Sequence, residues 1–277
     1  MKTAIFVRGN ARTWNYLKKD NIEFFNKIYN YPDWYVVIPD TGTVSRESLI
    51  EDFQGSNLIS IQLPPDSHYP FNPVYNDDDF AHWEFYTQAY WRQAWLDYLA
   101  GIAKRKYELT NGIRYNNIVA IRPDNWFTLL NEPIERAQTE LDPMAISNTN
   151  YSGELSFNDW VTPDFIWRAG STAADIFSMR LLDTHYTSSI PRQAIHVKEH
   201  SLPPYYQAKN FIGGTRTLGH FQAQIITPNA DFPWSGEKYN DNYYKVRWHE
   251  LSIDERTRIC VDMNINPRDY QLDTIKY

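Results

Sequence analysis

The sequence is poor in the features that mark a secreted or membrane-spanning protein. Its 277 residues include a single cysteine, Cys260, which excludes an internal disulfide and a cysteine-based zinc cluster. One cysteine also fits a reducing compartment. The apolar run near the N-terminus is too short for a signal peptide, and no apolar run approaches the roughly 18 residues that a membrane span needs. These absences predict a cytoplasmic protein without a transmembrane segment.

Positive charge is also scarce. The formal net charge of −7 at pH 7 gives no general attraction for nucleic-acid phosphates, and no basic stripe overrides it. We therefore expect no nucleic-acid partner. Aromatic residues, in contrast, are abundant at 16% of the chain. They suit sugar rings and nucleobases, but they suit hydrophobic cores equally well, and the core is their more common use.

Short apolar runs alternate with helical periodicity over the first 130 or so residues. The runs at 3–7, 34–38, 58–61 and 118–121 predict strands, and the segments 14–29, 45–53 and 80–109 predict helices. Continuously apolar strands are buried on both faces, so the alternation predicts an α/β fold with a mostly parallel sheet flanked by helices. In the longest helix, the aromatic and aliphatic residues Trp91, Trp95, Tyr98 and Ile102 are expected to form the packed face.

After Phe127 the pattern weakens. A helix over 172–182 with Ser171 as its N-cap and a strand over 221–226 are the elements that we expect there. No internal repeat and no linker divides the chain, so we expect a single domain.

The segment Arg122-Pro123-Asp124 follows a buried strand directly. Pro123 discourages the strand from continuing, and ligands of open α/β sheets bind at the carboxyl ends of strands. A carboxylate there suits a divalent metal, and a guanidinium suits a phosphate oxygen. The alternative is a surface Arg–Asp pair that merely ends the strand.

Arg8, Gly9 and Arg12 lie between the first strand and its helix. A helix N-terminus favours anions, and the two arginines would add charge-assisted donors, although the loop matches neither a Walker motif nor GxGxxG. The alternative is two surface arginines in a loop. Asp40 follows the second strand and either accepts a hydrogen bond from a ribose or base, or forms a turn next to Gly42.

Three segments carry a resemblance to a known family. Residues 4–13, 115–124 and 164–171, in this order and spacing, resemble the strand-and-arginine loop, the "strand then Arg-x-Asp" element and the acidic Gly-Ser element of GT-A-type glycosyltransferase-like proteins. The likeness is nearest to the bacterial and viral WavE-like group of surface-polysaccharide synthesis. It covers about residues 1–185.

The resemblance implies a GT-A-like, Rossmann-like single domain, with residues 1–130 as the nucleotide-binding half and 131–277 as the acceptor-side half. It implies a glycosyltransferase that moves a sugar from an NDP-sugar donor, foremost a UDP-sugar, to a carbohydrate or lipid-carbohydrate acceptor. For a viral protein, the location would be the host cytoplasm.

The resemblance also implies a divalent cation, Mn²⁺ or Mg²⁺, with Asp124 as its ligand. His200 and His220 are candidates for a further ligand, although an isolated histidine is more often a packed or surface residue. Arg122 departs from the first aspartate of the usual Asp-x-Asp motif. Metal dependence therefore stays open, because a guanidinium can neutralise a diphosphate without a metal.

Asp164 would lie near the acceptor and act as the base of an inverting enzyme, and Asp159 competes for that role. Two other functions remain open at this point. One is a protein that binds or hydrolyses nucleotide-sugars without a true acceptor, and the other is a non-catalytic carbohydrate-binding protein.

Overall fold

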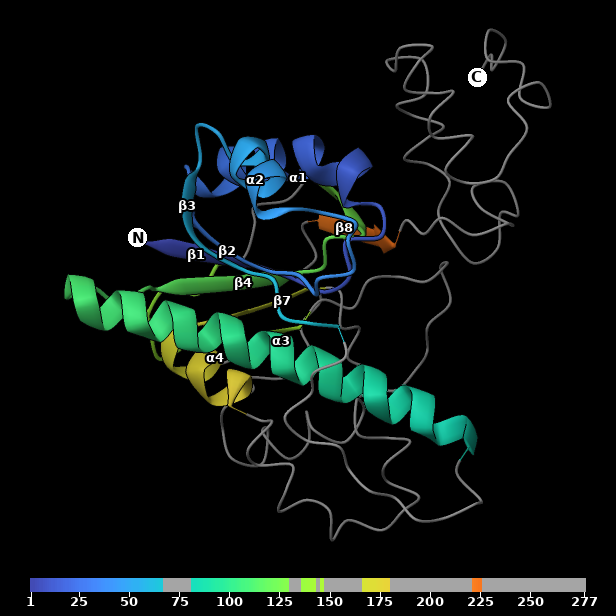
Figure 1. Cartoon of the computed structure of the whole chain (residues 1–277). Helices are drawn as coiled ribbons and strands as arrows, with labels where there is room; N and C mark the ends of the chain where they lie inside the picture. The colour runs from blue at the N-terminus through green and yellow to red at the C-terminus, as the bar shows by residue number, and fades with distance from the viewer. Residues whose placement is uncertain (67–80, 130–135, 143–144, 147–165, 180–220, 226–277) are drawn as a thin grey trace, which may run out of the picture.

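A central sheet organises the part of the chain that the structure describes (Figure 1). The computed structural model describes residues 1–66, 81–129, 136–142, 145–146, 166–179 and 221–225. Six strands form the sheet in the order β3-β2-β1-β4-β7-β6. Their bounds are Thr3–Arg8 for β1, Asp33–Val37 for β2, Asn57–Gln62 for β3, Asn117–Ile121 for β4, Ala145–Ile146 for β6 and Ile166–Ala169 for β7.

The strands β3, β2, β1 and β4 run parallel to one another. Strand β7 runs antiparallel to β4, and β6 runs antiparallel to β7. A separate antiparallel ribbon joins β5, Asn125–Leu129, to β8, Phe221–Ile225. The predicted α/β fold with a mostly parallel, Rossmann-like sheet is confirmed.

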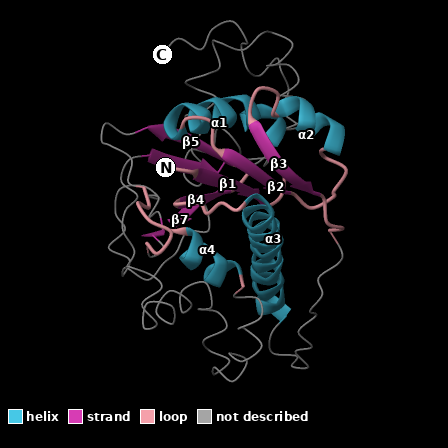
Figure 2. Cartoon of the chain, turned by 90° about the vertical axis from the view of Figure 1, so that its left-hand side faces the viewer, coloured by secondary structure: helices cyan, strands magenta, loops and turns pink. Residues whose placement is uncertain are grey.

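Helices cover both faces of the sheet (Figures 1 and 2). The helices α1, Trp14–Tyr29, and α2, Arg46–Asp52, lie on one face, and α3, Ala81–Asn111, and α4, Ser171–Ser178, lie on the other. Among the helices of the described ranges, none is long and apolar enough to cross a membrane.

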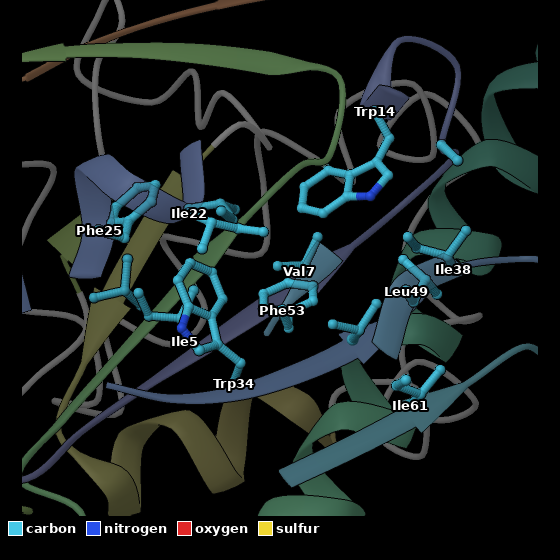
Figure 3. Close-up of a cluster of buried hydrophobic side chains, with 14 of the residues drawn as sticks. Ile5, Val7, Trp14, Ile22, Phe25, Trp34, Ile38, Leu49, Phe53 and Ile61 are labelled. Carbon is cyan, nitrogen blue, oxygen red and sulfur yellow. The ribbon is translucent and has the colours of Figure 1, made fainter. Parts of the chain in front are cut away.

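Two hydrophobic clusters result from the alternation of side chains along β1. Ile5 and Val7 point into the cluster under α1 and α2, whereas Ala4 and Phe6 point into the cluster under α3 and α4. Figure 3 shows the first cluster, in which the ring of Trp14 stacks on Phe53 at a centroid distance of 5.8 Å. Continuous apolar strands are therefore needed here, because each strand packs on both of its faces.

The predicted packing face of α3 is wrong at Ile102, whose side chain is exposed. Trp95 and Tyr98 are half-buried and stack on each other, and the side chain of Trp91 lies outside the described part. The buried stripe instead holds Ala94, Asp97, Ala100, Lys104 and Glu108. The reason is a close approach to α4, since a Cβ on Gly101 would lie 2.5 Å from the Ser178 Cβ. Small residues and paired charges fit such a face better than large rings.

The remaining boundaries follow the sequence closely. Helix α1 spans the predicted 14–29, and α2 begins after a capping box between Ser45 and Ser48. Ser171 is the first residue of α4 rather than its N-cap, which is Gly170. A Cβ at position 170 would lie 2.6 Å from the Glu140 carbonyl oxygen, so this position favours glycine. Strands β5, β6 and β7 were not expected from the sequence. The division at residue 130 stays a prediction.

Candidate functional site

The strand order reverses between β1 and β4, which are neighbours in the sheet. In open α/β sheets such a reversal leaves a crevice beyond the carboxyl ends of the two strands, where ligands bind. The register pairs Val7 with Ile121, so the residues that follow these two lie side by side. We call residues 8–12 and 122–124 the β1–β4 edge. The sequence placed five of its candidate residues there: Arg8, Gly9, Arg12, Arg122 and Asp124.

Gly9 allows the two halves of this edge to approach closely. Its φ of +132° lies in a region that side chains rarely adopt, and a Cβ would lie 3.3 Å from the Pro123 Cδ. Its N–H also donates to the Val37 carbonyl at 3.3 Å. Because Gly9 has no side chain, the loop after β1 can pass close to the ring of Pro123.

Arg8 is buried rather than exposed in a loop. Its side chain faces α3, where its Nε lies 2.8 Å from Oδ1 of Asp97, itself fully buried. The alternative of a surface arginine is therefore wrong for Arg8, and its role in binding a phosphate stays a prediction. Because two buried charges are tolerated only as a pair, each residue holds the other in place. The sequence did not single out Asp97, since nothing local marks it as the partner of a distant arginine.

Asp124 receives two hydrogen bonds from the fork of Arg122, at 2.8 Å from Nε to Oδ1 and at 2.7 Å from Nη2 to Oδ2. Nη1 of Arg12 lies 3.6 Å from the same Oδ2. Asp124 is only 1% exposed, whereas Arg122 and Arg12 are 19% and 46% exposed. The structure shows Arg122 paired with Asp124, whose side chain is buried, and the phosphate contact of Arg122 stays a prediction.

This arrangement does not fit Asp124 as the ligand of a divalent cation. Both carboxylate oxygens accept from guanidinium N–H groups, so a cation would have to displace Arg122 while standing beside two positive charges. Within the described ranges, no group of three or more His, Cys, Asp or Glu residues gathers to hold a metal. His200 and His220 lie outside the described residues. The Mn²⁺ or Mg²⁺ expected from the resemblance stays a prediction.

Asp40 lies beyond the carboxyl end of β2 with its side chain exposed. Its Oδ1 accepts from the Gly42 N–H at 3.3 Å, and its own N–H donates to the Pro64 carbonyl at 2.8 Å. The turn-forming role is thus visible, and the exposed carboxylate remains a candidate for a ribose or base contact.

Asn125, which the sequence did not suggest, follows Asp124 and is fully buried. Within the described part of the chain, neither its side-chain oxygen nor its side-chain nitrogen has a hydrogen-bond partner. Its backbone carbonyl accepts from Nδ2 of Asn21 at 2.7 Å, which ties α1 to this edge. An unpaired buried amide is uncommon in a native protein and calls for an explanation.

Asp159 and Asp164 lie outside the described residues. The strand that follows them begins at Ile166, which pairs with Ile121 at the carboxyl end of β4. The chain thus enters β7 two residues after Asp164, at the edge of the sheet that carries Arg122 and Asp124.

A second group of charges lies at the opposite end of the sheet, before β4. We call it the amino-edge cluster, and it consists of Lys104, Glu108, Arg114, Ser171 and Asp175. Ser171 donates its hydroxyl to Glu108 at 2.7 Å, and Lys104 lies 2.7 Å from Asp175. These contacts join α3 to α4 and to the start of β4. The cluster therefore fixes the fold and lies apart from the candidate site.

Glu108 is the centre of the amino-edge cluster. Burial alone would raise the pKa of its carboxyl, but hydrogen bonds from the Tyr115 N–H and the Ser171 hydroxyl, with the charges of Lys104 and Arg114, hold the pKa below its ordinary value. The pKa of Lys104 is lowered because burial outweighs the attraction of Asp175 and Glu108.

Comparisons with known proteins found likeness only among solved structures. No family model matches the chain, and no curated protein matches it. The apo-form glycosyltransferase GlyE of Streptococcus pneumoniae TIGR4 is 9% identical at a TM-score of 0.34, covering 72% of this chain and 44% of its own. This chain thus spans less than half the length of GlyE.

Two further solved structures are glycosyltransferases as well. One is involved in glycosylation of the major capsid of PBCV-1 and is 11% identical at a TM-score of 0.34, with 74% of this chain and 78% of its own covered. The galactosyltransferase LgtC, in complex with donor and acceptor sugar analogs, is 8% identical at a TM-score of 0.33, with 67% and 65% covered. Similarity at this level transfers no residue role to this chain.

Proposed function

We propose that this chain is a glycosyltransferase whose NDP-sugar donor binds at the β1–β4 edge. One observation carries the proposal: two guanidiniums, those of Arg12 and Arg122, meet at Asp124 from two neighbouring strand ends, at the point where the strand order reverses. The carboxylate of Asp124 offsets one of these two charges, whereas Arg8 is buried and paired with Asp97 of α3. The remaining positive charge and the exposed arginine donors suit a diphosphate.

The finer parts of the proposal come from the sequence resemblance. A UDP-sugar is the proposed donor, and a carbohydrate or lipid-carbohydrate of a surface polysaccharide or glycan is the proposed acceptor. Asp164 is the proposed base on the acceptor side, because the strand that follows it starts beside the end of β4. A positioned general base contributes about 10²–10⁴-fold in rate. Loss of transfer in Asp164→Asn supports this role, whereas loss only in Asp159→Asn moves it to Asp159.

The test of donor binding is calorimetric titration of nucleotides and NDP-sugars, with Arg12→Ala and Arg105→Ala as a matched pair. The two arginines are 46% and 43% exposed, but Arg105 lies beside the amino-edge cluster. We expect Arg12→Ala to weaken binding of nucleoside diphosphates about tenfold or more and Arg105→Ala to leave it unchanged. Equal affinities in both variants would remove the β1–β4 edge as the donor site.

A second assay separates the enzyme from the two other functions. The protein is incubated with the NDP-sugar that binds, with and without oligosaccharide acceptors. Transfer to an acceptor supports the glycosyltransferase. Release of free sugar alone would identify a nucleotide-sugar hydrolase. Binding of oligosaccharides without any binding of nucleotides would identify a carbohydrate-binding protein and overturn the proposal.

A further inference from the structure

We infer that Asp124 positions the guanidiniums of Arg122 and Arg12, and that these guanidiniums hold the donor diphosphate without a divalent cation. The inference rests on the proposed donor site at the β1–β4 edge and names its binding chemistry. It is opposite to the metal-assisted binding that the sequence resemblance implies. Asp124 is accordingly a positioning residue and not a metal ligand.

The first argument is the geometry of Arg122 and Asp124. Two parallel hydrogen bonds of 2.8 and 2.7 Å fix the plane of the guanidinium, because a single bond would leave it free to rotate. The carboxylate is 1% exposed and follows Pro123, whose ring restricts the backbone between the two partners. A guanidinium whose plane is fixed in this way matches phosphate oxygens in shape and charge.

The second argument is the electrostatic environment of Asp124. Arg122 and Arg12 both face its carboxylate. A dication beside Asp124 would be repelled by these positive charges. A diphosphate approaching the same place would be attracted by them, since guanidinium forks match phosphate oxygens in shape and charge.

The third argument is the exposure of the arginines. The Asp124 side chain is buried, whereas those of Arg122 and Arg12 are 19% and 46% exposed. A ligand arriving at this edge therefore meets the guanidiniums and not the carboxylate. Arg12 lies 3.6 Å from Asp124, beyond ordinary hydrogen-bond length, so it can turn toward a phosphate at little cost.

The test is calorimetric titration of UDP into the full-length chain in EDTA and, separately, in Mn²⁺ and Mg²⁺. We expect the same dissociation constant in all three conditions. Arg122→Lys keeps the charge but loses the fork, and it should weaken UDP binding about tenfold to a hundredfold in every condition. Arg105→Lys, a substitution at a more exposed arginine away from the edge, should bind UDP as the unchanged protein does.

Asp124→Asn tests the positioning role through the preference for UDP over UMP. If Asp124 holds Arg122 against the second phosphate, the substitution lowers this preference and leaves UMP binding unchanged. A merely structural role would weaken both nucleotides equally, which would overturn the assignment. Retained or increased preference for UDP would overturn it as well.

The two proposals fail in different ways. Binding of UDP that Mn²⁺ tightens tenfold or more, with the effect lost in Asp124→Asn, would overturn the inference and leave the donor site in place. Absence of binding by every nucleotide, with and without metal, would overturn the proposed function and the inference with it. The comparison of EDTA with Mn²⁺ needs no variant, so it stands even where a substitution prevents folding.

Discussion

The close approach of the loop after β1 to Pro123 depends on the missing side chain of Gly9. We expect Gly9→Ala to lower the free energy of unfolding by about 1–3 kcal/mol, since its φ of +132° disfavours a side chain and the Pro123 Cδ lies 3.3 Å from the new Cβ. Gly55→Ala is the control, because Gly55 also has a positive φ, +80°, but no atom within 4 Å of a Cβ. Chemical denaturation of both variants gives the comparison.

Gly55→Ala should cost only about 1 kcal/mol, the ordinary penalty of the left-handed region. Equal losses in the two variants would show that the backbone conformation alone matters at Gly9. A larger loss at Gly9, together with weakened nucleotide binding, would show that the crossing over Pro123 also shapes the donor site.

Asn125 carries a buried side-chain amide that finds no hydrogen-bond partner among the residues that the structure describes. We expect Asn125→Leu, which is similar in shape, to raise the free energy of unfolding by about 1 kcal/mol, because a penalty for burying an unpaired polar group disappears. Asn21→Leu is the control and should lower it by about 1–3 kcal/mol, since it removes the 2.7 Å hydrogen bond to the Asn125 carbonyl. Urea unfolding measures both.

Nucleotide titration of Asn125→Leu adds a functional readout. Reduced affinity in a variant of raised stability would identify the amide as a group kept for a ligand. Lower stability in Asn125→Leu would mean that the amide is paired in solution, and the prediction would be wrong.

The sequence suggested the residues of the β1–β4 edge, but it did not reveal the partners that come from distant segments. Arg122 and Asp124 are close in sequence, so one motif revealed both. Asp97 pairs with Arg8 from the middle of α3, and Asn125 is marked by side-chain atoms that have no hydrogen-bond partner among the described residues. Such relations depend on packing between distant segments, which periodicity and spacing do not encode.

At the scale of elements, the amino-edge cluster fastens α3 to α4. We expect Glu108→Gln to lower the free energy of unfolding by about 3–5 kcal/mol, because it leaves Lys104 buried with one fewer counter-charge. Glu140→Gln is the control. The Glu140 side chain is 46% exposed and pairs with Arg114 at 3.0 Å, so its loss should cost less than about 1 kcal/mol. A loss of unfolding free energy in Glu108→Gln as small as that in Glu140→Gln would contradict the central role of Glu108.

The same carboxyl makes the stability of the protein depend on pH. The pKa of Glu108 is lowered in the folded state, so its contribution is present above the unfolded pKa of about 4.3 and is lost as the pH falls through the lower folded value. We expect the unchanged protein to lose stability more steeply than Glu108→Gln between pH 6 and pH 3, values chosen around that pKa. Urea unfolding at each pH measures the stability of both proteins. The same dependence of stability on pH in both would contradict this prediction.

Elements differ in how well the sequence predicts them. The strands β1, β2 and β4 are continuously apolar because helices cover both of their faces, and this pattern is visible without a structure. Strand β7, Ile166–Ala169, has only four residues and includes Arg168, so it lacks such a signal. The packed face of α3 was misjudged because large aromatic residues look like a core, whereas close contact with α4 demands small ones.

At the scale of the whole molecule, the two halves expected from the sequence share one sheet. Strand β7 lies beside β4, and α4 covers the same face as α3. We expect residues 1–130 alone not to fold cooperatively, because β4 would become an exposed apolar edge and the amino-edge cluster would lose Ser171 and Asp175. Circular dichroism during heating of this fragment measures the outcome. A sharp transition would show that the first half is an independent unit.

The pairing of β5 with β8 affects when the β1–β4 edge is completed during folding. It pairs Asn125, the residue after Asp124, with Ile225, which is synthesised much later. Closing so long a loop carries an entropic cost that slows folding, and proteins rich in such distant contacts fold slowly. During translation, β1 and β4 can pair while β8 has not yet been made. The segment that leaves Asp124 therefore reaches its final partner only after most of the sheet is in place, so the β1–β4 edge is completed after the sheet that carries it.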